Sequence, residues 1–445
     1  MERHLAFRAV LFTLHIFLVI TIAIVRVNAG NQKRSGGTLE LEVLISEALE
    51  RNPEIIAARN RWLSAQEIVR ARRSFPDPRF SYTYFVESVE TRVGPQKNIF
   101  GAKQTFPFYG KRDLRANVAA KQAESLKESY QAGKSEVIRQ VKRSFYDLFY
   151  VSTIIDITHR EKELLKRFEH IAMTKYATGG GSQQDILKVQ VEISKLQDRL
   201  LTLSDHKQTA EAILNILVNR PVDRPLGKPQ TPKLRKFFYR QEELFTLAKE
   251  NRPELHEAKA LIEKSESAYK LAKKKYYPDL TIGVNYIQVD SGPLNVSDNG
   301  KDAFAVTTSI NIPIWFNKLS SQVKSAGERI RAQESAHQNV LNRTLFEVKD
   351  NYFRIQTARD TVDLYKAVLI PQAEQSMKSA EAGYISGIVS FLDLLDAERI
   401  LLRIQVDYWK AYAAYLKRIT DIERAVGVEL PEYPPVEFIP EIKEE

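Results

Sequence analysis

The chain has 445 residues, more than one ordinary globular domain needs, yet Gly and Pro number only 18 each, as is typical of long helices. There is no cysteine, which excludes disulfides, thiolate metal sites and a lipid-modified cysteine. The formal charge is +10. Because lysine and arginine are interleaved with aspartate and glutamate along helical segments, we expect solvated helix surfaces and no nucleic-acid partner.

Residues 1–29 have the pattern of a cleaved export signal. Arg3 and Arg8 precede an apolar run over 9–25, and small residues at the end of the segment offer a cleavage site. The alternative is a retained N-terminal membrane anchor. Later in the sequence no run of about eighteen apolar residues occurs, so cleavage would leave no transmembrane helix.

An internal repeat organises the rest of the chain. The pair Pro53-Glu54 returns as Pro253-Glu254, an offset of 253 − 53 = 200, and the segment 176–187 returns as 384–395, an offset of 384 − 176 = 208. Such recurrence predicts two copies of one structural unit. The predicted divisions are a first repeat over 30–220, a Pro-rich link over 221–240, a second repeat over 241–430 and a tail over 431–445.

Each half is expected to run helix, strand, loop, strand, long helix, tight turn, helix. In the first half the opening helix covers 39–73 and the long helix covers 111–176. Between them, and at the matching place in the second half, apolar and polar residues alternate with the two-residue period of a strand. The four predicted strands cover 79–87, 99–108, 280–290 and 303–312.

The helices that follow the two tight turns carry apolar residues at alternating spacings of three and four, which predicts coiled-coil seams. Lys207 and Arg418 are the exceptions. The same register in both halves indicates that both helices supercoil in the same way. The seam residues are Ile186, Val189, Ile193, Leu196, Leu200, Leu203, Ala210, Leu214 and Leu217, followed by Leu394, Ala397, Leu401, Ile404, Tyr408, Ala411, Tyr415, Ile422 and Ala425.

Four strands cannot close a membrane barrel, because single-chain barrels start at about eight strands and a bilayer tolerates no open sheet edge. Several chains must therefore share one barrel. A helix over 111–176 would reach on the order of 100 Å at about 1.5 Å per residue, which suits a periplasmic tunnel. The expected fold is mainly α with a small β part: a long coiled-coil α-helical barrel joined to a shared β-barrel.

The order of these motifs resembles the TolC-type outer-membrane efflux protein family. The resemblance rests on the duplicated segments at 52–54 and 251–254, the paired strands, the segment 106–112 (FPFYGKR) and the two tight turns. It implies a homotrimer with a twelve-stranded barrel in the outer membrane of a Gram-negative bacterium, in contact with outer-membrane lipid. It also implies a long periplasmic portion that meets a periplasmic adaptor protein and an inner-membrane pump of the RND type.

The function implied is a passive exit duct of a tripartite efflux system, and the segment 106–112 looks most like the heavy-metal-efflux branch. Two alternatives remain open: a type I secretion duct of the same fold, and a membrane-anchored coiled-coil scaffold protein. No catalytic motif, phosphate-binding loop or clustered metal ligand occurs in the sequence, so no enzyme activity, cofactor or metal site is expected. The sequence does not identify the cargo.

The tight turns are the candidate docking site for the adaptor. Glycine can end a helix in the left-handed conformation, and serine can cap the next helix. The structural alternative is that these residues only fold the hairpins. The predicted docking residues are Tyr176, Gly179, Gly180, Ser182, Gly387, Ile388 and Ser390.

A second candidate site is a charged aperture at the closed end of the tunnel. Asp393 and Asp396 lie three residues apart on one helical face just after the turn. The resemblance places Asp185 and Tyr384 with them, among the contacts that hold the aperture shut, although Asp393 could also serve only as a helix N-terminal charge. The resemblance also implies an arginine that helps to lock the closed state, but this chain has Val389 at that position, so a salt-bridged lock is not carried over.

Overall fold

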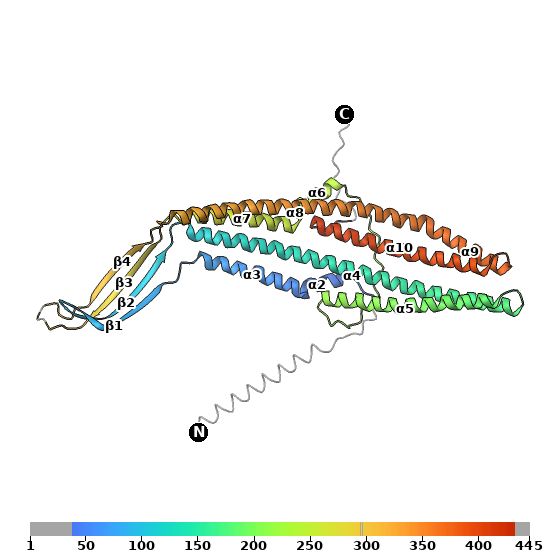
Figure 1. The fold of residues 1–445 in the computed structure, drawn as a ribbon, viewed down its shortest axis with the longest axis horizontal. Helices are drawn as coiled ribbons and strands as arrows, with labels where there is room; N and C mark the ends of the chain where they lie inside the picture. Colours follow the sequence, from blue (N-terminus) through green and yellow to red (C-terminus); the bar gives the residue numbers. More distant parts are fainter. Residues whose placement is uncertain (1–37, 294, 296, 432–445) are drawn as a thin grey trace, which may run out of the picture.

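The computed structural model describes residues 38–431 apart from 294 and 296, so the expected signal over 1–29 and nearly all of the expected tail lie outside the described residues. The described chain is strongly elongated, with the strands at one end and two helical hairpin turns at the other (Figure 1). In chain order the elements are α2 Leu41–Arg51, α3 Pro53–Arg73, β1 Arg79–Thr91, β2 Gly94–Phe106, α4 Lys111–Ala177, α5 Gln183–Leu217, α6 Gln241–Asn251, α7 Pro253–Lys274, β3 Leu280–Val289, β4 Ala303–Ile310, α8 Phe316–Leu364, the π-helix η1 Tyr365–Leu369, α9 Ile370–Ser386 and α10 Phe391–Val426.

The opening helix of each half is divided into two helices. For the first half, one continuous helix over 39–73 was predicted. Asn52 is extended (φ −63°, ψ 123°) because a residue before proline avoids the helical region. Its buried side chain starts the next helix: Oδ1 accepts from Glu54 N at 2.9 Å, and Nδ2 donates to Leu217 O at 2.9 Å. Arg252 breaks the second half at the equivalent place, between α6 and α7.

The four strands form one antiparallel sheet in the order β1-β2-β3-β4. The loop predicted between the first two strands, over 88–98, is mostly strand in the structure, because β1 and β2 continue up to a tight turn, and Gly94 has the positive φ of 121° that this turn needs. In the second half, β4 ends at Ile310, two residues before the predicted end. β2 likewise ends at Phe106, two residues before its predicted end, whereas β3, Leu280–Val289, matches its prediction to within one residue.

Strand register gives the sheet two chemically different faces. Tyr82 pairs with Phe100, Phe100 with Tyr286, and Tyr286 with Phe304, so these aromatic residues share one face. On the other face, hydroxyls and amides contact one another, as between Thr105 and Thr281 at 3.0 Å. The mainly apolar face carries Phe80, Tyr82, Tyr84, Phe100, Ala102, Phe106, Leu280, Ile282, Val284, Tyr286, Phe304, Val306 and Ile310, together with Asn98, Gln104, Gln288 and Thr308; the mainly polar face carries Ser81, Thr83, Lys103, Thr105, Thr281, Asn285, Thr307 and Ser309, together with Ile99, Ile287, Ala303 and Ala305.

The long helices match the prediction closely in the first half, where α4 has 67 residues and ends at Ala177. In the second half the corresponding helix is interrupted by the π turn η1, just before Pro371 at the start of α9. Proline has no backbone N–H to donate, and a wider turn accommodates that loss. No helix within the described ranges combines the length and the apolar character needed to cross a bilayer.

The helices pack through the predicted seams. Val189, Leu214 and Ile422 are completely buried, and every other predicted seam residue is buried or half-buried. The link over 221–240 contains no helix and packs across α10, where the hydroxyl of Tyr415 donates to Arg235 O at 2.6 Å. The core therefore lies along the helix seams, with one cluster near α2, α6 and the link and another toward the hairpin turns.

Candidate functional site

The two hairpin turns lie at the same end of the molecule, opposite the strands (Figure 1). Gly179 (φ 77°) follows α4 and Gly387 (φ 81°) follows α9, so both helices end on a left-handed glycine. Ser182 Oγ accepts from Asp185 N at 3.3 Å and caps α5, while Ser390 caps α10. The predicted turn geometry is confirmed, and it gives each of these residues a role in folding the hairpin.

Asp393 takes part in a reciprocal cap at the start of α10. Its backbone N–H donates to Ser390 Oγ at 3.2 Å, and its own Oδ2 accepts from Ser390 N at 3.3 Å and from Ser390 Oγ at 2.7 Å. This is the capping-box arrangement, with Asp in place of the more common Glu or Gln. Asp396, one turn later, has no capping role, and both carboxylates are exposed on the same side of α10.

Tyr384 joins the two hairpins. Only 5 % of it is exposed, and its ring packs against Phe391 with centroids 5.1 Å apart. From the other hairpin, the Lys175 ammonium lies 4.4 Å from the Tyr384 ring centroid and also donates to the Tyr384 carbonyl oxygen. Burial and the nearby Asp185 carboxylate raise the pKa of the Tyr384 hydroxyl. Asp185 therefore acts on Tyr384 through its charge, while the buried Tyr384 hydroxyl has no hydrogen-bond partner in the described part of the chain.

The remaining predicted docking residues lie in the turns or directly beside them. Ile388 is 84 % exposed at the end of the second turn, and Tyr176 is 50 % exposed at the end of α4. Gly180 lies in the first turn, where its N–H donates to Lys175 O at 2.9 Å. The tip therefore presents apolar side chains to solvent, whereas Asp393 and Asp396 lie on α10 beyond the turn.

Sequence reasoning missed a pair of buried carboxyl groups above the tip. Glu161 on α4 and Glu398 on α10 are 7 % and 2 % exposed, and each has one oxygen without a hydrogen-bond partner. Burial, followed by the hydrogen bond and charge of Glu161, raises the pKa of Glu398. The signal was present in the sequence, because each glutamate occupies an apolar position of its helix: Glu398 falls between Leu394 and Leu402 at spacings of four.

Comparison with known proteins identifies the family. The family model described as outer membrane efflux protein matches residues 44–220 and 244–428. This chain belongs to the outer membrane efflux protein family. It is 22 % identical to the cobalt-zinc-cadmium resistance protein CzcC of Cupriavidus metallidurans over 89 % of this chain and 91 % of CzcC. It is 18 % identical to the outer membrane protein TolC of Vibrio cholerae over 87 % of this chain and 90 % of TolC.

Solved structures confirm the fold of the efflux protein. The outer membrane protein VceC of Vibrio cholerae superposes with a TM-score of 0.73 at 20 % identity, over 87 % of this chain and 96 % of VceC. The expected α-helical barrel with a shared β-barrel is therefore confirmed.

Family membership also confirms the expected outer-membrane location and the expected role as a passive efflux channel without enzymatic activity. The channel works as a trimer with adaptor and inner-membrane pump partners. The alternative of a membrane-anchored scaffold protein is wrong.

Proposed function

We propose that this efflux protein is the outer-membrane exit duct of a divalent metal-ion efflux system driven by an RND-type pump. The observation that carries the proposal is the likeness to CzcC, which extends over 407 residues. The FPFYGKR segment agrees with this branch, and its lysine has a structural role: Lys111 Nζ pairs with Asp279 at 2.7 Å and joins the two repeats where strands become helices.

A tolerance assay tests the cargo. The gene is deleted from its native host, and growth is measured in zinc, cobalt and cadmium and, separately, in hydrophobic drugs. The proposal predicts loss of metal tolerance alone, restored by the wild-type gene. Loss of secretion of a protein substrate with unchanged metal tolerance would instead establish the type I secretion duct.

The tip turns support a second part of the proposal, docking of the periplasmic adaptor. Exposed apolar residues such as Ile388 are available for a partner, and the glycines keep the turns narrow. A photocrosslinking amino acid placed at Ile388 or Gly180 should trap the adaptor in cells. The same group at Tyr82 or Phe304, on the strands, is the matched control, and adaptor crosslinks from those positions alone would contradict tip docking.

The third part of the proposal is the aperture formed by Asp185, Tyr384, Asp393 and Asp396. Exposed carboxylates on one side of α10 would form charged rings once threefold symmetry repeats them. The closed state would depend on Tyr384, buried between the hairpins, and on the Lys175 ammonium over its ring. Lys175 would then supply the cation that is absent at Val389.

A further inference from the structure

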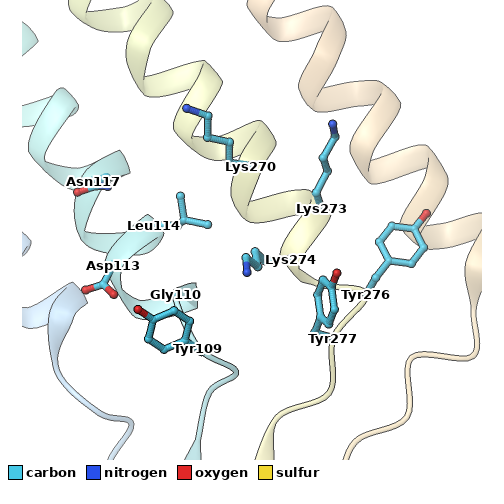
Figure 2. Close-up of a pocket in the computed structure, with 10 residues that line it drawn as sticks. All are labelled: Tyr109, Gly110, Asp113, Leu114, Asn117, Lys270, Lys273, Lys274, Tyr276 and Tyr277. Carbon is cyan, nitrogen blue, oxygen red and sulfur yellow. The ribbon is translucent and has the colours of Figure 1, made fainter.

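A basic groove lies between α4 and α7 where the helices meet the strands (Figure 2). It has a volume of about 750 Å³. Lys274 is the last residue of α7, six positions before β3 begins at Leu280. On the other wall, Gly110 precedes α4, four positions after β2 ends at Phe106. The groove residues are Tyr109, Gly110, Asp113, Leu114, Asn117, Lys270, Lys273, Lys274, Tyr276 and Tyr277.

The groove opens on the outer surface of the channel. Asp113, Lys142 and Asp156 project from about the same side of α4, because Lys142 and Asp156 follow Asp113 by 142 − 113 = 29 and 156 − 113 = 43 positions, close to whole numbers of helical turns at about 3.6 residues per turn. Lys142 and Asp156 contact Glu429 at 3.0 Å and Lys228 at 2.6 Å. Both partners belong to connecting segments that cross the helices, and such segments must lie outside a barrel whose lumen conducts.

The central position of β2 and β3 in the sheet keeps the groove away from the interfaces between protomers. The strands that continue from α4 and α7 are β2 and β3, the central pair of the sheet. Neighbouring protomers join through the edge strands β1 and β4, so the groove lies within one chain at the boundary between bilayer and periplasm. Below it the apolar face continues along Phe106, Leu280 and Val284.

Three lysines line the groove without a matching set of carboxylates, and the ammonium of one of them, Lys273, lies 4.4 Å from the ring centroid of Tyr269, outside the groove lining. Lys270, Lys273 and Lys274 form no ion pair with a carboxylate in the part of the chain that the structure describes. Asp113 is the one acidic residue that lines the groove. Lys274 is held in place by rings: its Nζ lies 5.3 Å from the Phe108 centroid and 5.4 Å from that of Tyr277, and these rings stack 4.6 Å apart.

We propose that this groove binds the phosphate group of a phospholipid in the periplasmic leaflet, with the acyl chains lying along the apolar face of β2 and β3. Lysine ammonium groups are the natural partners of phosphate, and aromatic residues prefer the headgroup level of a bilayer. Tyr109, Tyr276 and Tyr277 supply rings at that level. The proposal depends on the outer-membrane location of the strands and is independent of the cargo.

Lipid titration of the purified, delipidated trimer tests the proposal, with binding counted by native mass spectrometry. The ligands are phosphatidylglycerol, diacylglycerol, which has no phosphate, and inorganic phosphate. We expect phosphatidylglycerol to bind much more tightly than the other two. The triple variant Lys270→Gln, Lys273→Gln, Lys274→Gln should bind it roughly 100-fold more weakly, since each lysine near a headgroup contributes about fivefold.

A matched triple variant controls for the loss of charge. Lys349→Gln, Lys366→Gln and Lys378→Gln remove three exposed lysines from the helices α8, η1 and α9, and should leave lipid binding unchanged.

Asp113→Asn should strengthen binding of phosphatidylglycerol about two- to fivefold, because it removes the one repulsive carboxylate. Unchanged lipid binding in the groove variant would overturn the proposal, as would equally tight binding of diacylglycerol or inorganic phosphate. Metal tolerance of the same variants is a separate readout, so failure of this proposal and failure of the proposed cargo are distinguishable.

Discussion

Asn52 shows how one side chain can fix the junction of three helices. It caps α3 and satisfies the last carbonyl of α5, with 5 % of its surface exposed. Asn52→Ala removes the cap, which costs about 1 kcal/mol, and leaves a buried carbonyl unpaired, which costs about 1 to 3 kcal/mol more. We expect hydrogen exchange at Glu54 and Ile55 to accelerate at least tenfold. The exposed Asn60→Ala, inside α3, should leave these rates unchanged.

The buried pair Glu161 and Glu398 makes stability depend on pH. Since the pKa of Glu398 is raised in the folded protein, the folded state holds a proton that the unfolded state releases above its ordinary pKa of 4.5. The stabilisation is complete below that value and is lost as pH rises toward the folded pKa. Thermal unfolding followed by circular dichroism should therefore give a lower midpoint at pH 8.5 than at pH 5.5.

Glu398→Gln tests this dependence directly. The amide can still donate to Glu161 but does not titrate, so the fall in midpoint between pH 5.5 and 8.5 should shrink, by an amount corresponding to about 1 to 3 kcal/mol at the higher pH. Glu374→Gln, at an exposed position of α9, is the control and should keep the wild-type dependence. An equal fall in the unfolding midpoint between pH 5.5 and 8.5 in the wild type and both variants would show that the pair is not protonated as described.

At the scale of the elements, the second hairpin turn depends on the left-handed backbone of Gly387. A Cβ atom at this position would meet nothing within 4 Å, so the cost of Gly387→Ala is conformational alone, about 1 to 2 kcal/mol. We expect faster hydrogen exchange at the start of α10 in Gly387→Ala and a smaller effect in Gly387→Asn. Gly180→Ala should be neutral, because the φ of Gly180 is not positive and its nearest contact is at 3.9 Å.

Element order, strands and seams were predictable because each rests on a local period: two residues for the strands and alternating three and four for the seams. The break at Asn52 was also signalled, by Pro53, but a continuous apolar pattern across it concealed the boundary. The extension of β1 to Thr91 and of β2 back to Gly94 was not predictable, since pairing with a neighbouring strand overrides the weak local preference of residues such as Gln96 and Lys97.

The candidate site was only partly predictable, for a related reason. Local motifs located Ser182, Ser390 and both left-handed glycines, because caps act within a few residues. The contact between Lys175 and Tyr384 joins residues 209 positions apart, and no periodic pattern marks Lys175. Glu161 and Glu398 are also far apart in the sequence, and they meet only after the two hairpins have packed.

At the scale of the whole molecule, Lys175 is positioned to hold the two hairpins together. Its contacts with the ring and carbonyl of Tyr384 are lost in Lys175→Gln, and a cation over an aromatic ring contributes about 0.5 to 2 kcal/mol. We expect a higher open fraction, by a fewfold or more, in planar-bilayer recordings of the trimer. Lys166→Gln, an exposed lysine on the same helix, should behave as wild type. An unchanged open fraction in Lys175→Gln would show that closure rests on other contacts.

The aperture proposal makes a charge-specific prediction for the trimer. Asn substitutions separate charge from folding, because an amide oxygen at position 393 can still accept from Ser390 while the negative charge is removed. In Asp393→Asn with Asp396→Asn, the preference for cations over anions should fall and block by multivalent cations should weaken at least tenfold, since rings of carboxylates concentrate cations at a narrow point. Reversal potentials in asymmetric KCl and the concentration of half-block measure the two effects. Asp198→Asn, exposed in the middle of α5, removes the same charge away from the tip and should change neither. Wild-type selectivity and block in the double variant would contradict the aperture and leave Asp393 with its helix-capping role alone.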